Sequence, residues 1–223
     1  MTNKIKPNYF AGMIKTHEII RSNGMKCTVR DSRHRFMFPD EFTAFYDALK
    51  ARQKITFNFL INTGARINEV RSIQVQDIDF DRNSIILRWT KGRNKDGSRK
   101  MRVLSVSTQF IKWVRGIIKD NNLKPEDHFP ILSTPAANIA MKKTLKEMGV
   151  QDWMMFSVHN VRKTLETWLI SLDIDSLKII KHFGHSYNVA AKFYVSSDTF
   201  NYEDKRIIRT IIGDLYQPQS RGF

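Results

Sequence analysis

The stretch from His159 to Tyr194 carries side chains whose types and spacing could act on a phosphate ester. His159 and Arg162 lie three residues apart, so they project from one side of a helix. Gly184-His185 follows, and Tyr194 comes nine residues after that histidine. A guanidinium, two imidazoles and a phenol form a set that suits chemistry on a phosphodiester without a metal ion.

Arginine supplies the positive charge that such a reaction needs. Displacement at a phosphodiester builds negative charge on the non-bridging oxygens. A guanidinium offers a planar pair of donors and stays protonated at any working pH, so it can hold that charge without a metal. Arg66 and Arg162 are the candidates, although an arginine taken alone more often pairs with a surface acid.

A tyrosine nucleophile needs help, because its ordinary pKa is about 10 and only about one phenol in 10³ is ionised at neutral pH. His159 is the candidate general base, since an imidazole titrates near neutrality. On chemistry alone, Tyr187, Tyr202 and Tyr216 compete with Tyr194 for the role of nucleophile.

Two other groups of residues could suggest a metal centre. Asp77, Asp79 and Asp81 alternate, which could place three carboxylates on one face of a strand, as in a metal-dependent nuclease. A solvated edge or turn explains them without a metal, and we favour it. His182 and His185 lie three apart, but neither an HExxH arrangement nor a cysteine ligand accompanies them, so we expect no zinc site.

The chain is strongly basic. Its 223 residues include 37 Lys and Arg against 22 Asp and Glu, which gives a formal net charge of +15. This excess favours a polyanionic partner, and nucleic acid is the commonest one. A basic protein without such a partner is the alternative. The length fits one or two domains with a sizeable core.

Cysteine usage and hydropathy exclude several classes of protein. The single Cys27 excludes a disulfide framework and fits a reducing, cytoplasmic environment. No apolar run approaches the roughly 18 residues of a membrane span, so we expect no membrane segment. The first residues lack an apolar core, and we expect no secretory signal.

The segments that must position the candidate residues are mostly helical. Apolar residues recur at helical spacing in seven segments, and Gly64 is suited to cap the second. These segments are 39–49, opened by Pro39-Asp40, then 53–62, 67–73, 110–118, 141–148, 161–172 and a last one at about 202–216.

A small antiparallel sheet is expected between the third and fourth helices. Residues alternate in Asp77–Asp81 and again around Ile85–Trp89, a turn region follows at 91–98, and 100–106 is typical of the returning strand. The predicted fold class is therefore mainly α with a small antiparallel β-sheet (α+β).

Residues 1–37 differ in texture from the rest. They carry eight Lys and Arg and show little sustained periodicity. We interpret them as a basic arm or linker with at most a short helix around Met13–Arg21. A strand-clasping arm on DNA and a simple tether are equally open alternatives.

Several motifs resemble those of the tyrosine recombinases, also called the phage integrase family. Thr63-Gly-Ala-Arg66-Ile-Asn-Glu69 resembles the first arginine box, and His159-x-x-Arg162 resembles the second. Phe183-Gly-His185-Ser186, followed by Tyr194, resembles the third. Lys91 matches the family's turn lysine, and Asp77-Ile-Asp79 lies where the family has an acidic start of a strand. The motifs occur in family order across residues 38–223.

The resemblance implies a catalytic domain over 38–223 with the fold of that family. In it, Tyr194 would be the nucleophile that becomes joined to a DNA 3′-phosphate. Arg66 and Arg162 would clamp the scissile phosphate, with His185 as a further donor and His159 as base.

Two further roles follow from the same resemblance. Lys91 would be the general acid that protonates the departing 5′-hydroxyl, with Lys95 and Lys100 as rivals in this base-rich hairpin. Glu69 would orient Arg66 or hydrogen-bond a catalytic histidine, or form a simple ion pair with the arginine.

The implied partners are double-stranded DNA and further copies of the chain, because two duplexes need four active sites in a synaptic tetramer. The implied reaction uses no metal, ATP or other cofactor. The last helix could dock on a neighbouring subunit or fold back on its own core.

Family members usually have a helical core-binding domain ahead of the catalytic one, and residues 1–37 are too short for it. His182, Phe183 and Val161 replace more usual leucines, which we interpret as core variation.

Two functions from other classes stay open. One is a DNA-binding regulator that keeps the fold without cleavage, and the other is a relaxing enzyme similar to type IB topoisomerases. The complete residue set argues against the first, and the small size and histidine box argue against the second.

Overall fold

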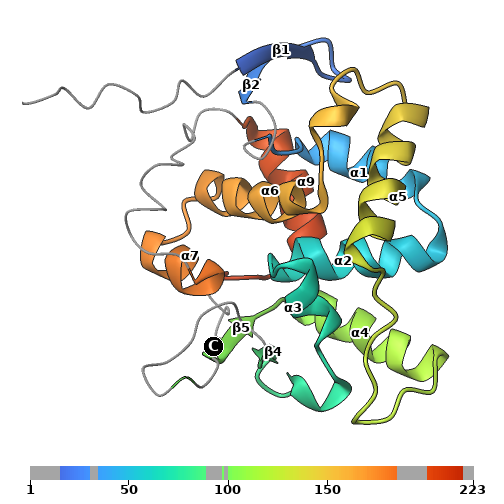
Figure 1. Cartoon of the computed structure of the whole chain (residues 1–223). Helices are drawn as coiled ribbons and strands as arrows, with labels where there is room; N and C mark the ends of the chain where they lie inside the picture. The colour runs from blue at the N-terminus through green and yellow to red at the C-terminus, as the bar shows by residue number, and fades with distance from the viewer. Residues whose placement is uncertain (1–15, 31–34, 89–96, 98–99, 185–199, 218–223) are drawn as a thin grey trace, which may run out of the picture.

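The computed structural model describes residues 16–30, 35–88, 97, 100–184 and 200–217, and helices make up most of them (Figure 1). The helices are α1 (Pro39–Ala48), α2 (Ala51–Thr63), α3 (Ile67–Arg71), α4 (Thr108–Asp120), α5 (Thr134–Glu147), α6 (Val158–Ser171), α7 (Ser176–Phe183) and α9 (Tyr202–Ile212). Two short 3-10 helices are η2 (Val75–Asp77) and η3 (Trp153–Met155). None of these helices combines the length and the apolar character needed to cross a membrane.

The strands of the described ranges form two antiparallel sheets. The first is a hairpin of β1 (Thr16–Ile20) and β2 (Lys26–Arg30). The second has the order β3-β4-β5, with β3 at Ile78–Asp79, β4 at Ser84–Leu87 and β5 at Arg102–Ser105. The expected fold class is confirmed, and a second sheet is added to it.

The β1–β2 hairpin is the sheet that our sequence analysis did not predict, and it lies in the segment that we expected to be an arm or linker. The expectation of a short helix around Met13–Arg21 is wrong, because Thr16–Ile20 form β1. The cause is Asn23-Gly24, which lies between two runs rich in β-branched residues, with Gly24 at φ 80°. Asn-Gly in this setting is a strong signal for a tight hairpin turn.

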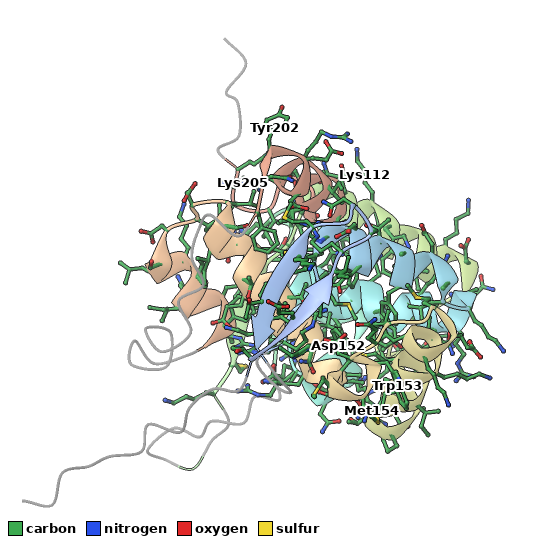
Figure 2. All side chains as sticks on the ribbon, turned by 90° about the horizontal axis from the view of Figure 1, so that it is seen from above. Lys112, Asp152, Trp153, Met154, Tyr202 and Lys205 are labelled. Atoms are coloured by element: carbon green, nitrogen blue, oxygen red, sulfur yellow. The ribbon has the colours of Figure 1, made fainter. Side chains whose placement is uncertain are left out.

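The hairpin is fixed to the helices by ion pairs. Arg21 donates to both carboxylate oxygens of Asp204, at 2.9 and 2.6 Å, and to Asp40 at 2.7 Å. His17 lies 2.9 Å from Asp152. Seen from above, β1 and β2 lie over the helices with Asp152 beside them (Figure 2). The hairpin therefore joins α9, α1 and the segment before η3 into one body.

Residues 77–81 form a turn more than a strand. Asp77 ends η2 and accepts a hydrogen bond from the Gln74 backbone N–H at 3.0 Å. Asp79 accepts from the backbone N–H groups of Asp81 and Arg82, at 3.1 and 2.9 Å, which turns the chain towards β4. These local side-chain bonds compete with strand pairing, so β3 is only two residues long.

Helix α6 lies at the centre of the molecule and carries the core (Figure 1). It packs against α2, α5, α7 and α9. Val161, Leu165, Trp168 and Leu169 are fully buried, as their spacing predicted. The Trp168 indole N–H donates to the Met37 carbonyl at 3.0 Å. Because a buried Trp→Ala change typically costs about 3–5 kcal/mol, this face sets the orientation of α6 and of the residues at its N-terminus.

Helix α9 is the last described helix, and it ends at Ile212, earlier than the predicted 216. Gly213, at φ 62°, terminates it. Ile208, Ile212 and Leu215 are buried, and α9 packs against α1, α2 and α6. Of the two arrangements considered, the apolar face therefore folds back on its own core here.

Candidate active site

The first arginine of the site, Arg66, is placed by a glycine turn. Helix α2 ends at Thr63, and Gly64 caps it in the left-handed conformation at φ 56°. A Cβ atom at position 64 would lie 2.6 Å from the Phe183 ring, so the turn also needs a residue without a side chain. Two residues later, Arg66 is the N-cap of α3 and its side chain is 39% exposed.

The second arginine, Arg162, is buried on α6. Its Nη1 donates to the Gly64 carbonyl at 2.6 Å and its Nη2 donates to the Phe183 carbonyl at 2.5 Å. The guanidinium also lies 4.9 Å from the centre of the Phe183 ring. Arg162 thus ties the turn of the first arginine motif to the start of the glycine-histidine motif.

The charge of Arg162 is held at some cost in free energy. Burial, with added repulsion from Arg66 and Arg102, lowers the pKa of Arg162 to about 10. The guanidinium is still protonated at neutral pH. An anion placed next to it would relieve the repulsion.

Glu69 organises the arginines. It is 3% exposed, and one carboxylate oxygen accepts from the Arg66 guanidinium at 3.0 Å. The other oxygen accepts from the Arg66 backbone N–H at 2.9 Å and from Arg102 Nη2 at 3.1 Å. The contacts therefore fit two of the roles considered, an ion pair with Arg66 and the orientation of its guanidinium.

Arg102 on β5 is a residue that our sequence analysis missed. Besides Glu69, it donates to the Phe183 carbonyl at 2.5 Å through Nη1. A Cβ atom on Gly184 would lie 2.5 Å from this same nitrogen. Burial lowers the pKa of Arg102, with Glu69 opposing the shift and Arg66 adding to it. The available signal was strand parity, because Arg102 lies on the same face of β5 as the buried Leu104.

His159 lies in the first turn of α6, three residues before Arg162, and keeps an exposed surface. Partial burial, followed by the positive charges of Arg162 and Arg66, lowers the pKa of His159 below its ordinary value. This shift favours the neutral imidazole, which is the form that can accept a proton. The structure thus brings Arg66, Glu69, His159 and Arg162 into one charged site.

Three expected site residues, Lys91, His185 and Tyr194, lie outside the described residues, as do their rivals Tyr187 and Lys95. The chain runs towards two of these segments from the site itself. Leu87 pairs with Arg102 across the hairpin that leads to Lys91, and Gly184, which precedes His185, lies against the Arg102 guanidinium.

The described rivals for the nucleophile differ in their surroundings. Tyr202 is 84% exposed at the start of α9 and projects outwards (Figure 2). Tyr216 is half-buried with its hydroxyl 2.7 Å from His182, and burial raises its pKa to about 12. A phenol so hard to ionise is poorly suited to attack.

Three of the residues considered as metal ligands, His182, Asp77 and Asp79, have protein partners. His182 lies 2.7 Å from the Tyr216 hydroxyl through Nδ1 and 2.9 Å from the Thr63 carbonyl through Nε2. Asp77 is buried and pairs with Arg88, and Asp79 bonds the turn that follows it. Among the described residues, no group of three or more His, Cys, Asp or Glu side chains could hold a metal ion.

Comparison with known proteins decides the family. Residues 35–199 match the model of the phage integrase family. The chain belongs to the phage integrase family. The resemblance of its motifs to those of the tyrosine recombinases is thereby confirmed.

Named relatives agree with this family. A tyrosine recombinase XerA from Saccharolobus solfataricus is 26% identical over 138 residues, which cover 61% of this chain and 43% of the relative. The integrase of Salmonella phage P22 is 22% identical over 180 residues, covering 70% and 45% of the two chains. The chain thus spans about half the length of the curated relatives that it matches.

Solved structures share the fold. The XerA recombinase superposes with a TM-score of 0.57 at 18% identity, over 78% of this chain and 64% of that one. The Tn1549 transposon integrase, solved in complex with circular intermediate DNA, gives a TM-score of 0.60 at 17% identity over 78% and 65%. The described fold is that of the phage integrase family.

Proposed function

We propose that this chain is the catalytic part of a site-specific DNA recombinase or integrase, which cleaves and rejoins DNA through a covalent 3′-phosphotyrosyl intermediate. The observation that carries the proposal is the arginine pair. Arg66 and Arg162 come from two different helical segments and meet at one site, where Glu69 holds Arg66 and the Phe183 carbonyl holds Arg162.

The arginine pair would bind the two non-bridging oxygens of the scissile phosphate. Arg66 is accessible from solvent and Arg162 is buried, so the pair would offer one anion an exposed donor and a buried one. Removing one such donor typically costs about 10²–10³ in rate. An arginine is suited to this role because two of its N–H groups can bond one phosphate at once.

The remaining roles come from the family motifs. Tyr194 would attack the phosphorus while its proton passes to His159, whose lowered pKa favours the neutral form. The bond from phosphorus to the 5′-oxygen then breaks, and Lys91 gives that oxygen a proton. His185 would add a donor to the phosphate. A 5′-hydroxyl of the partner strand reverses these steps, so ester bonds are conserved and neither ATP nor a metal is needed.

We assign residues 38–223 to this catalytic unit, with residues 1–37 ahead of it. Ile19 and Val29 of the β1–β2 hairpin and residues 35–37 are buried in the same core, so the folded unit also includes the described residues from Thr16 onwards.

The partner would be double-stranded DNA. The net charge of +15 favours a polyanion, and two similar proteins, the Tn1549 integrase and XerH recombinase, were solved with DNA. We further propose a tetramer on DNA, because two duplexes require four active sites. Such a protein would act in the cytoplasm, where its DNA lies.

A nicked suicide substrate tests the proposal. When a short 5′-fragment diffuses away after cleavage, the protein stays covalently bound to the 3′-phosphate and migrates as an adduct on denaturing gels. We expect an adduct with the unaltered chain in buffer containing a chelator, and none with Tyr194→Phe.

The rival tyrosines provide the matched controls. Tyr202→Phe and Tyr216→Phe should still form an adduct, whereas an adduct that survives Tyr194→Phe would place the nucleophile elsewhere. DNA binding without any adduct would favour the non-cleaving regulator. Relaxation of supercoiled DNA without strand exchange would favour the topoisomerase-like enzyme.

A further inference from the structure

His182, in the last turn of α7, is a buried polar residue that the proposed chemistry does not use. It is 2% exposed, and both ring nitrogens have partners. Nε2 lies 2.9 Å from the Thr63 carbonyl oxygen and Nδ1 lies 2.7 Å from the Tyr216 hydroxyl oxygen. The ring therefore bridges the end of α2 and the segment after α9.

The two partners determine where the protons are. A carbonyl oxygen only accepts, so Nε2 must carry a proton and donate it to Thr63. Burial, with added repulsion from Arg102 and Arg162, lowers the pKa of His182 to about 3, so the ring is neutral. Nδ1 is then a bare acceptor, and the Tyr216 hydroxyl donates to it. The Thr63 carbonyl thus fixes the tautomer, and the Tyr216 hydroxyl supplies the donor that the bare Nδ1 needs.

The Thr63 carbonyl matters because it begins the turn that carries the first arginine. It belongs to the last turn of α2, where carbonyl groups have no partner within the helix. The next carbonyl, that of Gly64, accepts from Arg162 at 2.6 Å, and Arg66 follows two residues later. A shift of the Thr63 peptide would move both the anchor of Arg162 and the backbone of Arg66.

Tyr216 is itself held in place by contacts remote from the site. Asp214 accepts from the backbone N–H and the hydroxyl of Thr108, both at 2.7 Å, at the start of α4. Arg209 on α9 donates to the Leu215 carbonyl at 2.9 Å. The Tyr216 ring also meets the His182 ring edge-on, with centroids 5.6 Å apart. The C-terminal segment therefore presents its hydroxyl to His182 from a fixed position.

We propose that His182 is a positioning residue for the arginine pair, and that the Tyr216 hydroxyl holds its ring in the orientation in which Nε2 donates to the Thr63 carbonyl. The inference rests on the proposed function, since it concerns the site where the phosphate would bind. It assigns a role in DNA cleavage to Tyr216, a residue that follows α9.

Four variants separate positioning from simple stability. His182→Leu and Tyr216→Phe each remove one partner of a buried hydrogen bond, whereas His182→Gln keeps an N–H that can reach the Thr63 carbonyl. The double variant His182→Leu/Tyr216→Phe replaces the polar pair by apolar groups, which is often nearly neutral for stability. Tyr46→Phe, at a half-buried tyrosine on α1 that stacks on Phe42, is the matched control.

The measurement is the single-turnover rate of adduct formation at saturating DNA on the suicide substrate. We expect His182→Leu, Tyr216→Phe and the double variant to react about tenfold more slowly, as for the loss of one buried hydrogen bond. DNA affinity should be unchanged, His182→Gln should regain most of the rate, and Tyr46→Phe should equal the unaltered chain. A slow double variant with an unchanged Tm separates positioning from stability.

A second readout follows the tautomer directly. Nitrogen-15 NMR of histidine side chains should show a protonated Nε2 and a bare Nδ1 for His182, also in Tyr216→Phe, because the Thr63 carbonyl still needs a donor. A proton on Nδ1 in the unaltered chain would overturn the proposed contact. Suppose that the unaltered chain forms an adduct and that His182→Leu, Tyr216→Phe and the double variant all form it at the same rate. The positioning role is then wrong and the recombinase proposal stands. If the unaltered chain forms no adduct, the proposed function itself fails.

Discussion

Arg102 and Arg162 donate to the same acceptor, the carbonyl oxygen of Phe183, each from 2.5 Å. One arginine comes from β5 and the other from α6, and Phe183 opens the motif that continues with Gly184-His185. Two charged donors on one carbonyl fix the backbone there more firmly than one would. Strand β5 and helix α6 are thereby both held to the end of α7.

Replacing Arg102 should therefore impair cleavage without removing a group proposed to touch DNA. In Arg102→Gln, Glu69 would still accept from Arg66 but no longer from a second guanidinium. The Phe183 carbonyl would still accept from Arg162 but from no other arginine. We expect adduct formation to slow by about 10- to 100-fold, since hydrogen bonds to charged groups are worth about 1.5–3 kcal/mol. The rate for Arg102→Lys should lie between those of the unaltered chain and Arg102→Gln, because one ammonium group cannot reproduce the two-pronged guanidinium.

Arg82→Gln is the matched control for Arg102→Gln. The Arg82 side chain is 84% exposed and pairs with Asp79 at 3.4 Å, away from the arginine pair. Its variant should cleave at the original rate. Equal rates for the Arg102 and Arg82 variants would show that the Phe183 carbonyl needs no second donor.

A methyl group at position 64 should destabilise the fold, whereas one at position 116 should not. In Gly64→Ala the new Cβ would lie 2.6 Å from the Phe183 ring, and φ is 56°. We expect a loss of at least about 1–3 kcal/mol, as for strained left-handed backbone. Gly116, inside α4, has open space around it, so Gly116→Ala should gain about 0.5–1 kcal/mol. Urea unfolding of both variants measures the difference, and equal midpoints would contradict it.

The pH profile of cleavage should reflect a histidine base with a lowered pKa. His159 must be neutral to accept the tyrosine proton, so the rate should rise as pH increases through its pKa. Burial and the nearby Arg162 and Arg66 place that pKa below 6.5. Single-turnover rates at subsaturating DNA report the pKa of the free protein. Between about pH 5 and about pH 9 they should rise on the acid side and be level from neutral pH upwards. A half-maximal rate above pH 7 would mean that another group is the base.

Acid should destabilise the chain partly through His182. Its pKa is about 3 in the folded protein against 6.5 in an unfolded chain, with Arg102 and Arg162 as its charged neighbours. As pH falls from about 6.5 towards 3, His182 binds a proton in the unfolded chain but not in the folded one. The free energy of unfolding therefore decreases across that window. We expect the Tm to fall with pH there, and to fall less in His182→Leu. Parallel Tm curves for the two proteins would rule out this contribution.

Features set by local sequence were predicted correctly. The apolar stripe of α6, the helix opened by Pro39 and the cap at Gly64 all follow from spacing and backbone preference within a few residues. Glu69 lies three residues after Arg66 on the same short helix, so their contact was also foreseeable.

Features set by tertiary contacts were not predicted. Arg102 meets Glu69 and Phe183 across 33 and 81 residues of sequence, and His182 meets Thr63 across 119. No local sequence pattern predicts such contacts. We interpreted His182, which replaces a more usual leucine, as core variation. The β1–β2 hairpin is different, because Asn23-Gly24 was a local signal that we overlooked.

The buried ion pair between Arg21 and Asp204 opposes the transfer of α9 to a neighbouring subunit. Asp204 lies in the first turn of α9 and is 3% exposed, so pulling the helix away would strand a charge on each side of the break. A neighbouring subunit that accepted the helix would have to offer its own cation to this aspartate or leave the N-terminal turn behind. Exchange of the last helix between subunits would then be slow, and the hairpin at the opposite end of the chain would control its rate.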